Sequence, residues 1–139
     1  MDYDDVKEQI KADEALRLSP YRCSEDKLTI GWGWNLDDNP IPLEVAELLF
    51  EYSFEAAKRD AAKFVGPMTW SQLDITRQGV VINMAFNLGY SRLSGFRRFR
   101  QYLQQGDYEM AANEMINSKW YRQVKSRAKR LVLTMRSGE

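Results

Sequence analysis

The chain has 139 residues, which fits one compact domain, and its apolar fraction of 44% is sufficient for a hydrophobic core. It contains one cysteine and no histidine. These counts exclude an internal disulfide and any Ser-His-Asp or Cys-His catalytic site, and they argue against a tetrahedral zinc site. Catalysis, if there is any, must use carboxylates, hydroxyls, the one thiol or a cofactor.

Charge is unevenly distributed along the chain, although twenty basic residues balance twenty acidic ones. Residues 1–65 hold eight basic and fifteen acidic side chains, a net charge of −7, and residues 66–139 hold twelve and five, a net charge of +7. A basic half suits an anionic partner, but solvated helix faces give the same counts. No stretch approaches the roughly 20 apolar residues of a membrane span, and the acidic start of the chain differs from a signal peptide. We therefore expect a protein made in the cytoplasm without an export signal.

The first part of the chain is predicted to contain one helix and one strand. The acidic start is typical of a helix N-terminus, and this helix is expected to end between residues 14 and 16. Residues 28–34 alternate large and small side chains, which predicts a single strand. Its large side chains share one face: Leu28, Ile30, Trp32 and Trp34. The opposite face, formed by Thr29, Gly31 and Gly33, is bare and lets another group approach the backbone closely.

The remainder is predicted to be helical. An apolar stripe predicts a long helix over residues 43–64: Ala46, Leu49, Phe50, Ser53, Ala57, Ala61 and Phe64. Gly66-Pro67 is expected to end it, and Thr69–Gln72 has the pattern of a capping box that opens a helix running to Gly89. Four shorter helices are expected at residues 94–105, 107–117, 118–124 and 126–135. One small sheet with a helical remainder predicts an α+β fold.

Three residues with useful chemistry are expected to lie near the bare strand face. A hairpin turning at Asp26 would place Cys23 opposite Thr29, and Glu14 comes just before this hairpin. Each residue also has a purely structural interpretation. A lone cysteine often packs inertly, a threonine suits any strand, and a glutamate at a helix end is usually solvated.

Three separated segments carry a resemblance to a known family. They are Asp13–Leu18 with Tyr21 and Thr29–Gly33, then Ile82–Gly89, then Ser118–Gln123 with Arg127–Arg130. They resemble, in this order, the active-site hairpin, the central helix and the C-terminal signature of the phage lysozymes of glycoside hydrolase family 24, the T-even-phage type. The resemblance covers nearly the whole chain.

The resemblance implies an α+β, lysozyme-like fold in a single domain, residues 1–139. A small β lobe of about residues 17–42 would be joined by a connecting helix, residues 43–65, to a mainly helical lobe. That helical lobe would contain residues 1–16 and 66–139, and the saccharide would bind in the cleft between the lobes.

The catalytic pattern of the family is a Glu, eight residues, an Asp or Cys, five residues and a Thr, which Glu14, Cys23 and Thr29 match. Hydrolysis of a glycosidic bond needs a proton for the leaving oxygen. Glu14 is the implied general acid, and the resemblance implies that Arg127 pairs with it. A thiol of ordinary pKa, near ~8.5, is mostly neutral at pH 7, so Cys23 is a weak substitute for the usual carboxylate. We expect Cys23 to help Thr29 hold a water; a thiolate nucleophile is the alternative, and the outcome at the anomeric carbon stays open.

Further residues are expected to bind substrate or support the site: Gly31, Asn83, Asn87 and Arg127. The resemblance favours the cleft for Asn87 and a supporting role for Asn83, and no metal or cofactor is implied. Three aromatic residues are expected to lie in the core rather than to stack on a sugar: Phe86, Phe96 and Trp120. Basic clusters at residues 97–100 and 125–130 can steer the protein to a polyanionic wall.

The function implied by the resemblance is that of a phage or prophage endolysin. Such a muramidase hydrolyses the β-1,4 bond between N-acetylmuramic acid and N-acetylglucosamine in bacterial peptidoglycan, for host lysis. It would act as a monomer on glycan strands in the periplasm, after a holin has made the membrane permeable.

Three alternatives belong to other reaction or function classes. A lytic transglycosylase cleaves the same bond with one acid and no second carboxylate, which the cysteine at position 23 favours. A non-catalytic wall-binding module would keep the fold without the chemistry. Nucleic-acid binding through the basic half is disfavoured by the net charge of zero and by the lack of a known reader motif.

Overall fold

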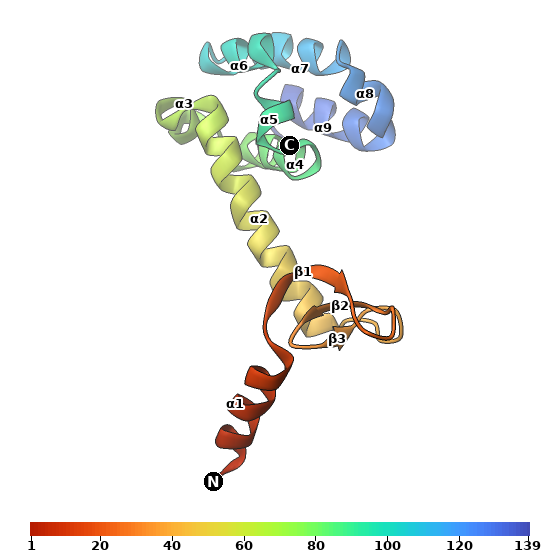
Figure 1. Cartoon of the computed structure of the whole chain (residues 1–139). Helices are drawn as coiled ribbons and strands as arrows, with labels where there is room; N and C mark the ends of the chain where they lie inside the picture. The colour runs from red at the N-terminus through yellow and green to blue at the C-terminus, as the bar shows by residue number, and fades with distance from the viewer. The chain divides into compact units, whose positions relative to one another are not determined.

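The computed structural model describes residues 1–139 and contains nine helices and one three-stranded antiparallel sheet, the α+β composition that the sequence predicts. The chain divides into two compact units, Met1–Leu48 and Leu49–Glu139 (Figure 1). No helix combines the length and the apolar character that a membrane span requires. The predicted assignment of residues 1–16 to the helical lobe stays a prediction.

The first unit consists of one helix, the sheet and the start of a long helix. Its elements are α1 (Tyr3–Glu14), β1 (Arg17–Arg22), β2 (Leu28–Gly31) and β3 (Trp34–Asn35), with the strands in the order β1-β2-β3. Asp2 caps α1, because its side chain accepts a hydrogen bond from the Asp5 N–H at 3.0 Å and the Asp5 side chain accepts one from the Asp2 N–H at 2.9 Å. The helix ends at Glu14, where Ala15 takes a positive φ of 60° and redirects the chain into β1.

The hairpin between β1 and β2 turns one residue earlier than predicted. Tyr21 lies opposite Thr29 and Arg22 opposite Leu28, so Cys23 does not face Thr29 directly. The cause is a tight turn in which the Asp26 N–H donates to the Cys23 carbonyl at 2.8 Å and Asp26 takes a positive φ of 60°, a conformation that aspartate tolerates. The partner of Thr29 is therefore two residues earlier than predicted, Tyr21 instead of Cys23. Side chains two residues apart on a strand point to the same face, so Cys23 and Thr29 still share a face.

The predicted single strand over residues 28–34 is wrong. The chain reverses at Trp32 and Gly33, so that Ile30 of β2 lies opposite Trp34 of β3. Gly31 and Gly33 have φ values of 72° and 83°, which L-residues rarely adopt. The segment in which large and small side chains alternate therefore forms a tight hairpin, and glycines occupy the two positions of positive φ.

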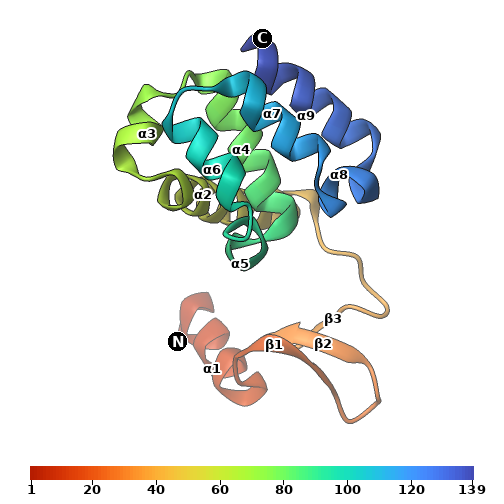
Figure 2. The same cartoon turned by 90° about the horizontal axis from the view of Figure 1, so that it is seen from above.

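The second unit is entirely helical. The long helix α2 (Leu43–Val65) begins in the first unit and continues into the second. It is followed by α3 (Pro67–Gln72), α4 (Ile75–Leu88), α5 (Tyr90–Leu93), α6 (Arg97–Gln104), α7 (Tyr108–Ile116), α8 (Lys119–Val124) and α9 (Ser126–Ser137). Helix α4 packs on α9, and α7 packs on both α6 and α9 (Figure 2).

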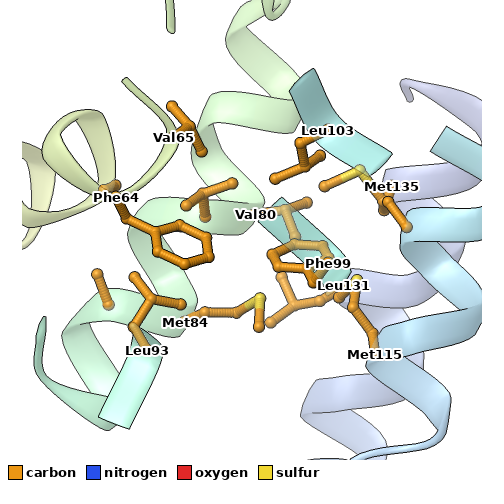
Figure 3. Close-up of a cluster of buried hydrophobic side chains, with 14 of the residues drawn as sticks. Phe64, Val65, Val80, Met84, Leu93, Phe99, Leu103, Met115, Leu131 and Met135 are labelled. Atoms are coloured by element: carbon orange, nitrogen blue, oxygen red, sulfur yellow. The ribbon is translucent and has the colours of Figure 1, made fainter. Parts of the chain in front are cut away.

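One hydrophobic core holds these helices together, and Figure 3 shows its central residues. Its largest fully buried side chains come from six helices: Val65, Val80, Met84, Leu93, Phe99, Leu103, Met115 and Met135, among others. The predicted burial is confirmed for the end of the α2 stripe, at Ala57, Ala61 and Phe64, and for Trp120. Phe86 is 44% exposed, so its predicted core position is wrong; its ring instead contacts that of Phe50, at 5.7 Å between centroids.

The helix boundaries differ from prediction where a stronger local signal acts. Thr69 does not cap a helix: it is buried inside α3, which begins at Pro67, because proline is preorganised for the first helical position. Asp74 caps α4 instead, accepting a hydrogen bond from the Arg77 N–H at 2.8 Å. The predicted helix over residues 94–105 is α6, which begins three residues later than predicted, and the short helix α5 before it was not predicted. Helices α7, α8 and α9 follow their predicted ranges closely.

Candidate active site

The Glu14 carboxylate lies against the backbone of Gly33. A Cβ atom built on Gly33 would stand 2.9 Å from Glu14 Oε2, closer than real Cβ contacts permit. The sequence predicts that another group approaches the backbone of Thr29, Gly31 and Gly33. In the structure that group is the Glu14 carboxylate, and it approaches Gly33 in the β2–β3 turn. Nothing lies within 4 Å of a Cβ atom built on Gly31. This position therefore favours glycine only because its φ is positive.

Replacing Gly33 by alanine is expected to lower both stability and activity. The positive φ alone costs roughly 1–2 kcal/mol for an L-residue, and the added methyl group would displace the Glu14 carboxylate. Gly106→Ala is the matched control, because Gly106 has a φ of 73° with open space around it. Both variants should melt at lower temperature, and only Gly33→Ala should lose more activity than its loss of folded protein explains. Equal activity per folded molecule in both variants would contradict this role of Gly33.

Cys23 and Thr29 form a second pair of polar groups on the β1–β2 hairpin. Thr29 is 3% exposed, and its hydroxyl donates to the Lys27 carbonyl at 2.8 Å. Backbone hydrogen bonds from Lys27 and then Glu25 lower the pKa of the half-buried Cys23 thiol, and a hydrogen bond with the Thr29 hydroxyl adds to this. Partial burial and the Glu25 carboxylate act the other way and are outweighed. The hairpin therefore favours the thiolate more than an ordinary cysteine environment does.

The lowered pKa of Cys23 predicts a pH profile for alkylation. Iodoacetamide reacts with the thiolate, so its rate with Cys23 should reach half-maximum at a lower pH than with a free cysteine peptide. Thr29→Val removes one stabilising hydrogen bond and should move the midpoint upward, whereas Thr29→Ser keeps the hydroxyl. Because the chain has one cysteine, mass spectrometry reads this site alone. A midpoint at or above that of the free peptide would refute the assignment.

In the second unit, Asn83 of α4 fixes the side chain of Arg127 on α9. Arg127 Nε donates to Asn83 Oδ1 at 2.8 Å, and Arg127 Nη2 donates to the Asn83 carbonyl oxygen at 3.4 Å. Asn83 thus holds the guanidinium group of Arg127 in place, and its supporting role in a substrate site stays a prediction. The pairing of Arg127 with Glu14 joins two different units and stays a prediction.

Asn87, also on α4, accepts a hydrogen bond from the Trp120 indole N–H at 2.9 Å. Its carbonyl oxygen is therefore committed to the protein, which leaves the amide NH₂ group as the donor it can offer to a ligand. The sequence predicts a core position for Trp120 but does not predict its hydrogen bond to Asn87. A buried indole N–H needs a hydrogen-bond acceptor. A tryptophan predicted to be buried therefore also predicts a polar side chain, such as that of Asn87, on a neighbouring helix.

The structure brings Glu14 to Gly33, Cys23 to Thr29, and Asn83 to Arg127. No group of three or more histidine, cysteine or acidic side chains is arranged to hold a metal ion. The reactive groups of the first unit are therefore one carboxylic acid, one polarised thiol and one buried hydroxyl.

The chain is similar to proteins of known kind. A family profile described as Phage lysozyme matches residues 11–137. The pre-baseplate central spike protein Gp5 of Enterobacteria phage T4 is 30% identical over 158 aligned residues, which cover 94% of this chain and 27% of Gp5. Two probable T4-type lysozymes of Dictyostelium discoideum are each 24% identical over 160 residues, covering 96% of this chain and 94% of theirs. The chain thus spans about a quarter of the spike protein and nearly all of either lysozyme.

Proposed function

This chain belongs to the phage lysozyme family, and from that premise we propose that it hydrolyses the β-1,4 bond between N-acetylmuramic acid and N-acetylglucosamine in bacterial peptidoglycan. The observation that carries the proposal is the catalytic spacing of Glu14, Cys23 and Thr29, which lies inside the matched region. The T4-type lysozyme relatives support a glycoside hydrolase of the lysozyme kind.

Glu14 acts as the general acid in this proposal. Cleavage requires a proton on the leaving oxygen while positive charge develops at the anomeric carbon. Glu14 is held at the end of α1 with its carboxylate against Gly33, so its reach is limited by the β2–β3 turn. Arg127, braced by Asn83, is proposed to pair with it.

Cys23 and Thr29 are proposed to hold the attacking water. The single Thr29 hydroxyl proton can go to the Lys27 carbonyl or to the Cys23 sulfur, and in either case the Thr29 oxygen keeps lone pairs, so a bound water would donate one hydrogen to that oxygen. The Cys23 sulfur, with its lowered pKa, accepts the second hydrogen, which leaves a lone pair of the water free to attack.

A lytic transglycosylase is the second candidate, and one observation favours it. Position 23 carries a thiol where a carboxylate would otherwise stabilise the oxocarbenium-like centre, and transglycosylation needs one acid and no bound water. In that reaction the muramic acid 6-hydroxyl attacks the anomeric carbon and an anhydro ring forms.

Mass spectrometry of digested peptidoglycan separates the two reactions. Hydrolysis adds one water and leaves reducing muramic acid ends, whereas transglycosylation leaves anhydro ends that are lighter by one water. We expect reducing ends; a digest dominated by anhydro ends would replace hydrolysis by transglycosylation, and an undigested wall would leave only a binding module.

Host lysis as an endolysin, with a holin giving access to the periplasm and the enzyme acting as a monomer, is proposed as the biological setting. The net charge of +7 on residues 66–139 supports attraction to an anionic wall. Expression with and without a holin tests the setting: lysis should require the holin. The similarity to a central spike protein raises another setting, a lysozyme module within a larger particle, which association of the chain with purified particles would reveal.

A further inference from the structure

The second unit contains a cationic pocket that the proposed hydrolysis does not use. Its volume is about 540 Å³, and it lies among α5, α6, α8 and the end of α7. Four basic residues line it: Arg92, Arg97, Arg98 and Lys119. Their side chains come from three separate helices, so the pocket is built by tertiary packing rather than by one basic segment.

The charges of this cationic pocket are mostly unpaired. Glu114 is its one acidic residue, and Glu114 Oε1 stands 3.5 Å from Arg98 Nε. Arg92, Arg97 and Lys119 form no ion pair anywhere in the chain, so four basic and one acidic side chain leave a net charge of +3. Like charges gathered in one hollow repel one another, and a bound anion would relieve that repulsion.

The floor of the pocket is apolar. The Phe96 and Trp120 rings meet edge to face with 6.4 Å between centroids, beside Leu88 and Phe99. The indole N–H of Trp120 already donates to Asn87, so this floor offers carbon surface rather than hydrogen bonds. A ligand that fits therefore carries a strong negative charge on a body with an apolar face, as a saccharide ring has.

We propose that this cationic pocket binds a phosphoryl group carried on a saccharide. The planar guanidinium group of arginine matches two phosphate oxygens at once, and a phosphate monoester carries a charge of about −1.5 to −2 at pH 7. A single carboxylate would neutralise only one of the three unpaired cations. The site is independent of Glu14, Cys23 and Thr29, and the ligand is a sugar phosphate monoester, either free or at the end of an envelope glycan.

Calorimetric titration of the full chain with glucose 6-phosphate tests the proposal, with glucose as the uncharged probe. Glucose 6-phosphate should bind and glucose should not. Arg92→Gln and Arg97→Gln should each weaken binding about tenfold. Arg130→Gln is the matched control, because Arg130 is exposed on α9, outside the pocket and without an ion pair. Equal binding of glucose, or an equal loss in Arg130→Gln, would overturn the proposal.

The pH dependence separates a phosphate monoester from a carboxylate ligand. The second ionisation of the monoester lies near pH 6, and the chain has no histidine to titrate in that range. Affinity should therefore fall several-fold from about pH 7.5 to about pH 5; an unchanged affinity would refute recognition of the dianion. Competition by a glycan that ends in a phosphate monoester assigns the source to the envelope, and no competition assigns it to the free sugar phosphate. Poly(glycerol phosphate), a diester with one charge per phosphate, is the control that should not compete. Glu14→Gln should bind like wild type, so failure of the lysozyme assignment leaves this result unaffected.

Discussion

Glu14→Gln is expected to lower the rate of peptidoglycan cleavage by about a hundredfold to ten-thousandfold while leaving the fold intact. The glutamine amide has nearly the shape of the carboxyl group, so it can occupy the space beside Gly33, but its N–H protons are not acidic enough to be delivered to the leaving oxygen. Within the first unit Glu14 makes no hydrogen bond or ion pair, so the free energy of unfolding should change by no more than about 0.5 kcal/mol.

The measurement is the clearing of a wall suspension alongside thermal unfolding of the same preparations. Asp13→Asn is the matched control, because Asp13 precedes Glu14 in α1 and its replacement removes the same single negative charge. It should clear walls at close to the wild-type rate. A Glu14→Gln protein that clears walls as fast as wild type would refute the acid role.

The local rules of helix capping account for most of the fold that the sequence predicted. Asp107 and Ser118 each accept a backbone hydrogen bond at the start of a helix, and the predicted starts of α7 and α8 agree with them. The prediction failed at Thr69, where two signals competed. Pro67 opens α3 two residues before Thr69, and Asp74 caps α4 after it, so neither helix begins at Thr69.

The pairing of Cys23 and Thr29 on one face of the hairpin could be predicted from the sequence, whereas the geometry of the hairpin could not, and the roles of these residues stay predictions. Alternate residues of a strand point to the same face, which predicts that Cys23 and Thr29 share a face. This holds in the structure, although the turn lies one residue earlier than predicted. The register did not follow from sequence, because the positive φ of Asp26 is set by the turn as a whole and aspartate is only one of several residues that accept it. The reversal at Gly33 is the same kind of failure: a strand and a tight turn both give alternating large and small residues.

Cys23→Ser is expected to keep the fold and lose most of the activity, by roughly tenfold to a thousandfold. Serine keeps a hydrogen-bonding group at this position, but its hydroxyl does not ionise near neutral pH, so the negative charge that the hairpin favours on Cys23 cannot form. Thermal unfolding separates this from misfolding: the melting temperature should stay near that of wild type. Wall clearing at the wild-type rate would show that the thiol is dispensable.

Cys23→Asp completes the test, because aspartate supplies the negative charge that serine cannot. If position 23 serves to hold and polarise a water, Cys23→Asp should retain or exceed wild-type activity and release reducing ends like wild type. If the cysteine instead attacks the anomeric carbon as a thiolate, the wild type should trap a glycosyl–sulfur adduct detectable by mass spectrometry of the intact chain, and Cys23→Asp should abolish that adduct. The lowered pKa of Cys23 increases the fraction of thiolate, which accepts a hydrogen bond from water better than a neutral thiol does, but it also makes the thiolate a weaker nucleophile. The hairpin geometry therefore favours the water-holding role, and an adduct in wild type would overturn it.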